Sequence, residues 1–453
     1  MMRKAFAELV YEPTFYRLYG HFNGQEFYRF LRNAQWNPIE KNREIQSELL
    51  FNIVDYAANN IPYYQKIVER NGIAYSKATI YDDLRKFPIL TKVIIRREFG
   101  NLYKPRSSNW YYEATGGSTG EFVKLVQDYD YKMKMMLVKR WQKEWAGVHV
   151  GETEIKLWAS ERDLLQGSLH WRNRLDNYFR NVTLLNAYKL DRARMMKYVD
   201  IINRKRPKLI LAFVQSIYEL ARFIEENEIA VHTPNAIMTS AGVLYPQFRE
   251  KIESVFKCKI FDRYGSREVG DVSCECDRHD GHHVSMFNAH VEILGKDMMP
   301  CGEEETGEIY VTLLTNFTMP LIRYQMGDVA TYTEHRCSCG RGLPLIKNIV
   351  GRTNCILRTR KSVLDSVSIM SVFCGHPKLD SIVKFQVIQK KADLISVKVV
   401  VNDLEHWKKD KAVLDDKLRR ILGEDVKYEY ELLDDINPLR SGKYQYIISE
   451  LKE

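Results

Sequence analysis

The chain has 453 residues, of which 45% are hydrophobic and 28% charged, and its formal net charge is +9 at pH 7. This composition excludes a disordered protein, since such chains have too little apolar surface to bury, and the length favours two or more domains. No apolar run approaches the roughly 18 residues that a membrane span needs, and the basic amino terminus lacks the apolar stretch of a signal peptide, so we expect a cytoplasmic protein.

The first hundred residues predict helices. Apolar residues recur at three- and four-residue spacing over 40–58 and 63–71, the periodicity of a helix that buries one face. Pro62, Pro88 and Pro105 separate these segments.

A glycine-rich segment follows, which combines glycines, hydroxyl side chains and a lysine. Glycine lets backbone N–H groups approach phosphate oxygens, hydroxyls donate further hydrogen bonds and lysine adds charge. The spacing differs from the ordinary P-loop, because Val123 and Leu125 predict a strand after the loop and not a helix. The alternative is a surface hairpin without a ligand. We predict a polyphosphate-binding loop, with residues Thr115, Gly116, Gly117, Ser118, Thr119, Gly120 and Lys124.

Strands and helices then alternate, which predicts a mostly parallel sheet with helices on its faces. We expect strands at 155–158, 209–213, 236–239 and 259–264, and helices at 217–227 and 246–256. The stretch 172–208 is rich in lysine and arginine. Such a stripe could bind nucleic acid or a membrane surface, but a solvated helix face is the more common case.

Short strands separated by turns are expected at 291–294, 307–313 and 321–324, as in an antiparallel barrel or meander. A different pattern begins at Gly351. It predicts a compact α+β unit with a hairpin, a helix and a further strand, at 385–388 with 394–401, 407–422 and 428–430 respectively. We therefore expect a core domain of residues 1–350 and a small domain of residues 351–453.

Five further segments follow the glycine-rich loop, and each carries chemically useful residues. They are 240–244, 261–268, 324–328, 351–354 and 437–443, which begin Ser-Ala-Gly, Phe-Asp-Arg-Tyr-Gly, Tyr-Gln-Met-Gly-Asp, Gly-Arg-Thr-Asn and Asn-Pro-Leu-Arg-Ser-Gly-Lys. In this order the set resembles the adenylate-forming superfamily. Within it the chain is similar to the phenylacetate–coenzyme A ligase family and its relatives in capsule and exopolysaccharide gene clusters. The likeness covers nearly the whole chain, and the ordered set is specific although each motif is short.

The resemblance implies an α/β and α+β fold. A large N-terminal adenylate-forming domain would contain parallel sheets flanked by helices and a small β-barrel-like part, and a small mobile α+β domain would follow. It also implies ATP-dependent activation of a carboxylic acid as an acyl-adenylate, with release of pyrophosphate, and then transfer to coenzyme A. ATP or AMP and Mg²⁺ are the implied cofactors, and a homodimer is one implied assembly.

Individual residues can be matched to these roles. A carboxylate such as Asp328 can accept hydrogen bonds from both ribose hydroxyls, and Glu268 would help to hold magnesium. Tyr264 offers a flat face for adenine or substrate. The resemblance places Lys443 against the carboxylate and the α-phosphate, with Arg352 as a further catalytic residue. Taken one by one, these residues could equally be solvated or lie in turns. The other nucleotide-binding residues that it implies are Ser240, Ala241, Gly242, Asp262, Gly265 and Ser266.

Eight cysteines in a chain of this length do not make a disulfide framework. Four clustered positions instead offer three thiolates and an imidazole, which suit tetrahedral zinc. Relatives often carry Cys…Gly-x-His…Cys-x-Cys in these places, which implies a closed structural zinc site. His282 and Cys274 compete as ligands, and free buried thiols without metal are the alternative. The expected ligands are Cys276, His283, Cys337 and Cys339.

The chain also departs from the family pattern. The joint reads Gly351-Arg352-Thr353-Asn354 where the family has an acidic hinge residue, and the following turn at 359–365 lacks the usual glycine and proline. In relatives this turn flanks the coenzyme A path. The acyl acceptor could therefore be an amine, a sugar hydroxyl or a carrier protein, as the capsule-cluster relatives suggest.

Two hypotheses of other classes are also considered. A zinc-containing nucleic-acid-binding protein would explain the basic stretch and the cysteine pairs, but their spacing is not that of a zinc finger and no basic-aromatic pattern recurs. An inactive scaffold would have no need of Asp328, Glu268 and Lys443. We therefore expect a small carboxylic acid as the partner and no nucleic acid. Pocket residues are expected from Phe213, Gln215, 240–242 and Tyr264 and do not identify the acid.

Overall fold

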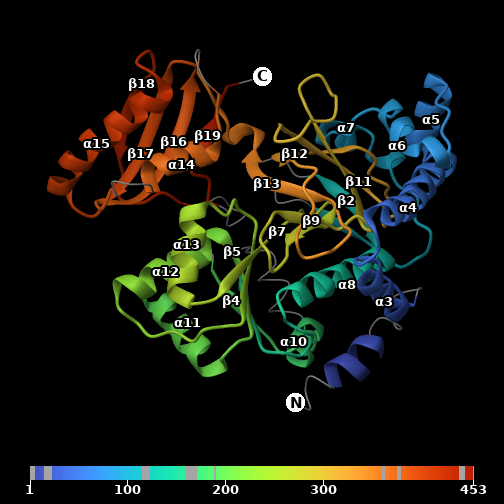
Figure 1. Cartoon of the computed structure of the whole chain (residues 1–453), viewed down its shortest axis with the longest axis horizontal. Coiled ribbons are helices and arrows are strands. Elements are labelled where there is room, and N and C mark those ends of the chain that lie inside the picture. Colours follow the sequence, from blue (N-terminus) through green and yellow to red (C-terminus); the bar gives the residue numbers. More distant parts are fainter. Residues whose placement is uncertain are drawn as a thin grey trace.

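The computed structural model describes residues 6–14, 23–114, 123–158, 171–187, 190–359, 363–374, 379–437 and 444–451. The C-terminal strands and helices lie beside α12 and α13, and the N-terminal helices lie at the far side of the molecule (Figure 1). Among the described helices, none is both long and apolar enough to cross a membrane.

Helices dominate the N-terminal part, as predicted. Pro62 occupies the first turn of α5, where its missing N–H costs nothing, and Gly72 ends the helix in the left-handed conformation. The segment begins with the π-helical turn η1 (Ala7–Tyr11). The elements that follow are α3 (Gly24–Ala34), α4 (Ile39–Asn60), α5 (Pro62–Asn71), η2 (Lys77–Thr79), α6 (Ile80–Asp83), η3 (Leu84–Lys86), α7 (Lys92–Arg97) and η4 (Phe99–Asn101).

A hairpin of β1 (Trp110–Ala114) and β2 (Lys124–Asp128) leads into helix α8 (Tyr129–Trp145). The Asp128 carboxylate accepts a hydrogen bond from the Tyr131 backbone N at 2.7 Å and so caps α8. The strand predicted after the glycine-rich loop is therefore present. Residues 115–122 of the loop itself lie outside the described residues.

One half of the central sheet is parallel, as predicted. All five residues of β5 are buried, which is expected of a strand covered by helices on both faces. Its strands are β3 (Glu154–Trp158), β4 (Val182–Asn186), β5 (Leu209–Phe213), β6 (Ala236–Ser240) and β7 (Lys259–Ser266), and its helices are α10 (Trp171–Phe179), α11 (Arg192–Lys205), α12 (Val214–Glu226) and α13 (Pro246–Phe256).

The other half of this 11-stranded sheet is antiparallel and continues from β7. Its strands are β8 (Gly270–Glu275), β9 (His282–Val284), β10 (Ala289–Leu294), β11 (Thr306–Leu313), β12 (Tyr324–Tyr332) and β13 (Leu345–Arg352). The strand expected at 321–324 is wrong in position, because β12 only begins at Tyr324. Arg323 has a φ of 50°, and its guanidinium donates to the Phe87 carbonyl at 3.0 Å. These contacts hold residues 321–323 in a turn.

The C-terminal residues form a separate four-stranded sheet in the order β18-β17-β16-β19. The predicted hairpin, helix and strand at 428–430 are all present, and a later strand, β19, was not predicted. The elements are η5 (Thr353–Cys355), β14 (Leu357–Arg358), β15 (Val363–Leu364), α14 (Ser366–Cys374), β16 (Ile382–Lys391), β17 (Leu394–Val401), α15 (Leu404–Leu422), β18 (Lys427–Leu432) and β19 (Ile447–Ser449). One apolar cluster joins this unit to the parallel strands and to α12 and α13.

Asp83 organises the turn that precedes Phe87. Its carboxylate accepts hydrogen bonds from Lys86 Nζ at 2.6 Å, Thr79 Oγ1 at 2.6 Å and the Ser76 backbone N at 3.0 Å. These bonds, that from Lys86 first, lower the pKa of Asp83 to about 2. A folded pKa below the unfolded value of 3.8 means that the contribution is complete above about pH 4. It is lost as the pH falls towards 2.

We expect Asp83→Asn to lower the free energy of unfolding by about 1 kcal/mol at pH 7, the net value of a typical hydrogen bond. The difference from the native chain should shrink as the pH falls from 4 towards 2. Thermal unfolding at several pH values measures this. A difference that grows towards low pH would contradict the assignment.

Candidate active site and candidate metal centre

Three motifs that are distant in sequence meet at Asp328. The Tyr264 hydroxyl donates a hydrogen bond to Asp328 Oδ2 at 2.9 Å, and Arg352 Nε lies 3.5 Å from Asp328 Oδ1. Asp328 and Arg352 are direct partners across β12 and β13. The Asp328 side chain is 15% exposed, so it can still contact a ligand.

Glu268 lies just beyond β7 and is oriented by a second tyrosine. The Tyr324 hydroxyl donates to Glu268 Oε1 at 3.2 Å, and Glu268 is buried. Burial first, and then the neighbouring carboxylate, raises the pKa of both Tyr264 and Tyr324 well above the usual value. Both phenols are therefore protonated and act as donors. Sequence analysis assigned no role to Tyr324 itself, although this residue opens the Tyr-x-x-Gly-Asp motif.

The end of β7, where the turn to β8 begins, also has features of a binding site. A Cβ on Gly265 would lie 2.1 Å from the Gly270 carbonyl oxygen, so only glycine fits there. The Ser266 hydroxyl is buried and has no hydrogen-bond partner among the described residues. Buried polar atoms are normally paired. An unpaired hydroxyl at this position fits a ligand that would accept from it.

The strands that flank the glycine-rich segment lie beside this turn. Gln127 Nε2 donates to the Arg267 carbonyl at 2.9 Å, and Arg267 Nη1 lies 3.9 Å from Glu113 Oε1. Lys124 is exposed, and its ammonium lies 3.5 Å from the centre of the Tyr112 ring. The hairpin that carries the loop thus contacts the residue next to Glu268. The loop residues Thr115 to Gly120 lie outside the described part of the chain.

Ser240 ends β6, and Ala241 and Gly242 lie in the bend that follows. Ala241 has a φ of 67°, a left-handed conformation that costs energy for alanine. A Cβ on Gly242 would lie 3.4 Å from Val214 Cβ, which is an ordinary contact. Backbone strain of this kind is frequent at binding sites, and the nucleotide role of these residues remains a prediction.

Asp262 is held in an internal network. It accepts a hydrogen bond from Thr239 Oγ1 at 2.5 Å, and its other oxygen lies 3.8 Å from His282 Nε2. Its backbone N donates to Glu275 at 3.0 Å. Burial raises the pKa of Asp262. These contacts give Asp262 a structural explanation, and its role towards nucleotide stays a prediction.

Lys443 also lies outside the described residues. The predicted pocket residue Gln215 lies at the start of α12, where it bonds to Tyr446 of the C-terminal unit.

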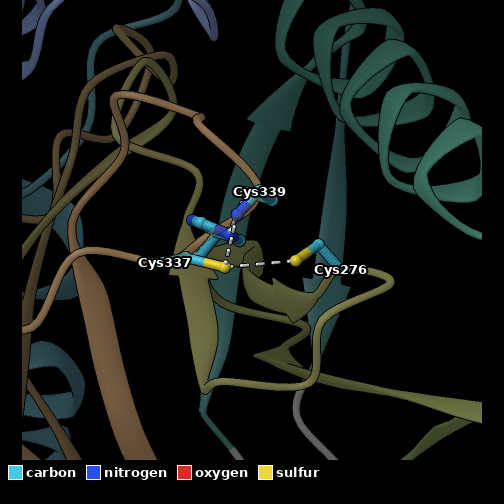
Figure 2. A group of neighbouring side chains, drawn as sticks. Cys276, Cys337 and Cys339 are labelled. Carbon is cyan, nitrogen blue, oxygen red and sulfur yellow. Dashed lines mark hydrogen bonds between the residues drawn. The ribbon is translucent and has the colours of Figure 1, made fainter.

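The structure brings the four expected metal ligands together. Their ligand atoms all lie within 4.8 Å of one another. Cys276 Sγ is 3.6 Å from Cys337 Sγ, and Cys339 Sγ is 3.3 Å from His283 Nε2. Figure 2 shows the sulfur atoms of Cys276 and Cys337 facing each other. Tetrahedral zinc, with Zn–S bonds of about 2.3 Å, holds its ligands roughly 3.8 Å apart, so the donors fit this metal.

Backbone N–H groups point at all three sulfur atoms. They come from Arg278, Cys339 and Arg341 and lie 3.4 to 3.5 Å from Cys276, Cys337 and Cys339 respectively. Burial alone would raise the pKa of the Cys339 thiol. The hydrogen bonds to His283 and the Arg341 backbone outweigh this effect and lower the pKa to about 6. These donors favour the thiolate form that a metal requires.

The geometry also separates the competing ligands. Neighbouring residues of a strand point to opposite faces, so His283 joins the cluster and His282 lies beside Asp262. The Cys274 thiol donates to the Glu275 carbonyl at 3.3 Å. Neither His282 nor Cys274 belongs to the cluster found among the described residues.

Comparison with known proteins identifies relatives of both parts of the chain. Residues 356–450 match the family model described as the CapK C-terminal domain. Protein CapK of Staphylococcus aureus is 25% identical over 421 residues, which cover 90% of this chain and 89% of that protein. A phenylacetate-coenzyme A ligase of Thermus thermophilus is 24% identical over 381 residues, which cover 81% of this chain and 83% of the ligase.

Solved structures of an acyl-CoA ligase have a fold similar to that of this chain. A 2-hydroxyisobutyryl-CoA ligase in its postadenylation state has a TM-score of 0.76 at 15% identity, with 92% of each chain covered. The same ligase in its thioesterification state has a TM-score of 0.62, with 92% of this chain and 91% of the ligase covered. The chain is thus a homologue of CapK and of the phenylacetate–coenzyme A ligases, with the fold of the adenylate-forming acyl-coenzyme A ligases.

Proposed function

We propose that this chain activates a carboxylic acid with ATP as an acyl-adenylate, releases pyrophosphate and transfers the acyl group to coenzyme A. The observation that carries the proposal is the convergence of Tyr264, Asp328 and Arg352 from three separate motifs. The homologues support the same chemistry.

The reaction requires a carboxylate to attack the α-phosphate, so two anions must meet. Catalysis then depends on positioning and on positive charge. Asp328, oriented by Tyr264, would hold the ribose, and Arg352 and Lys443 would offset the developing charge. Magnesium, when bound by Glu268 and phosphate oxygens, would supply further charge neutralisation. The loop 115–124 would bind the leaving pyrophosphate.

A panel of aryl, fatty, amino and hydroxy acids tests this proposal through acid-dependent release of pyrophosphate from MgATP. At least one acid should give release above the rate with ATP alone. Strong salt-sensitive binding to random DNA, with no acid-dependent release, would instead favour a nucleic-acid-binding protein.

Asp328→Asn should raise the KM for ATP about tenfold or more, because a charge-assisted hydrogen bond is worth about 1.5–3 kcal/mol. The asparagine keeps an oxygen for the Tyr264 hydroxyl, so the melting temperature should change little. The matched control is Asp416→Asn, whose carboxylate pairs with Arg420 on the surface of α15. An unchanged KM for ATP in the Asp328 variant would remove this residue from the nucleotide site.

Two observations favour an acyl acceptor other than coenzyme A. The C-terminal unit matches the CapK domain, and the turn at 359–365 departs from the pattern that flanks the coenzyme A path in relatives. An amine, a sugar or a carrier protein could therefore replace coenzyme A, in polysaccharide biosynthesis. Coenzyme A consumption in step with pyrophosphate release would decide for the thiol. Release without consumption would decide for another acceptor.

The proposal includes two structural features. The core domain would comprise residues 1–350, and a mobile small domain would comprise residues 351–453. Gly351 at the joint has a φ of 129°, a conformation that glycine adopts readily and that a hinge can use. Cys276, His283, Cys337 and Cys339 would hold one structural zinc, with all four ligands from the protein.

A further inference from the structure

The segment after Lys443 belongs to the C-terminal sheet through its backbone. β19 pairs in parallel with β16, and the Val387 backbone N donates to the Tyr446 carbonyl at 2.7 Å. The Tyr444 hydroxyl donates to the Phe385 carbonyl at 2.8 Å. Residues 444–449 therefore move with the C-terminal unit.

The Tyr446 side chain leaves that unit and reaches the core. Its hydroxyl donates a hydrogen bond to Gln215 Oε1 in α12. Its ring packs edge-on against Phe248 and Tyr245, with ring centres 5.7 and 6.5 Å apart. One residue thus carries polar and aromatic contacts across the boundary between the two units, which adjoin in Figure 1.

Gln215 is fixed in the orientation that Tyr446 requires. Its Nε2 donates to Glu219 Oε1 at 2.6 Å, so its oxygen faces the tyrosine. In this orientation the amide pairs its N–H with the Glu219 carboxylate and its oxygen with the Tyr446 hydroxyl. Burial raises the pKa of Glu219, and burial with the nearby Glu219 carboxylate raises that of Tyr446 well above its usual value. The phenol therefore remains a donor.

Arg222 makes a second polar contact between the same two units, since its Nη1 donates to the Val383 carbonyl at 3.0 Å. Arg222 and Gln215 both lie on α12, so this helix carries polar bonds to two places on the C-terminal unit.

We propose that Tyr446 is a latch that holds the C-terminal unit against α12. The latch itself does not rest on the proposed function, whereas its effect on the two reaction steps does. A rotation of the unit for acyl transfer would break the Tyr446–Gln215 bond, so the latch favours the adenylation arrangement over the transfer arrangement.

Hydrogen–deuterium exchange on the full chain without ligand tests the latch. Tyr446→Phe removes only the hydroxyl, and exchange in 444–451 and 214–226 should rise about tenfold, as expected when one hydrogen bond near 1.4 kcal/mol is lost. Gln215→Leu should give the same change in 444–451 from the core side. The double variant should add little, because both changes break the same bond.

Tyr444→Phe is the matched control, since its hydroxyl bonds within the C-terminal unit. It should leave exchange in 214–226 unchanged. The latch is refuted if Tyr446→Phe exchanges like the native chain, or if both tyrosine variants change 214–226 equally.

Activity provides a separate measurement, with the acid that gives the fastest pyrophosphate release in the panel. Tyr446→Phe should slow adenylation about tenfold and leave transfer from preformed acyl-adenylate unchanged or faster. Equal slowing of both steps would show that the latch does not favour the adenylation arrangement. If the native chain activates no acid, the proposed function fails, and the exchange result still decides the latch.

Discussion

Lys443→Ala is expected to slow acyl-adenylate formation about 100- to 1000-fold, the usual effect of removing a donor that stabilises developing charge. The lysine would lie between the attacking carboxylate and the α-phosphate, where its charge would offset the negative charge of both groups. Single-turnover formation of acyl-adenylate measures the effect. Transfer from preformed acyl-adenylate should change much less.

Lys409→Ala is the control for this substitution, because Lys409 is an exposed lysine of α15 in the same unit. It should keep the native rate. A Lys443→Ala variant that forms acyl-adenylate within a few-fold of the native rate would contradict the assigned role.

Loss of the proposed zinc should have the largest effect on stability. Cys339→Ser would remove one of the four clustered donors and leave two other thiols close together. The free energy of unfolding should therefore fall by more than about 4 kcal/mol, the range reached when a bound metal is lost. Metal analysis should find one zinc per native chain and none in the variant. The melting temperature should fall with it.

Cys258→Ala is the control, since Cys258 lies outside the cluster and is only partly exposed. It should keep the zinc and most of the stability. The loop that carries Cys339 also binds the N-terminal helices, because Asn42 Nδ2 donates to the Gly342 carbonyl at 2.7 Å and the Gly342 N donates to the Gln35 carbonyl at 2.8 Å. Zinc loss should therefore increase proteolysis of α3 and α4. A native chain without metal would contradict the zinc proposal.

The local elements were largely predictable from the sequence, because periodicity and proline positions act over short distances. Helix α13 spans the predicted residues 246–256 and starts at Pro246. The turn at 321–323 was not predictable, since the conformation of Arg323 depends on carbonyls more than 200 positions earlier. The continuity of the 11-stranded sheet likewise depends on pairings between distant strands.

The candidate site was likewise predictable only in part from the sequence. The sequence motifs identified Tyr264, Asp328 and Arg352 as site residues. Only the structure shows the hydrogen bond and the ion pair that join them. The sequence left His282 and His283 as alternatives, and strand alternation separates them. No local pattern marks the Tyr446–Gln215 bond, which joins residues 231 positions apart.

Oxygen labelling tests the central claim most directly. A carboxylic acid that the chain turns over, labelled with ¹⁸O in both carboxyl oxygens, should pass one labelled oxygen to AMP when the acyl group is transferred, because the acid oxygen becomes the bridge to the α-phosphate. Labelled AMP and unlabelled pyrophosphate are the predicted products. Turnover that gives unlabelled AMP, or ADP with labelled phosphate, would show that no acyl-adenylate forms.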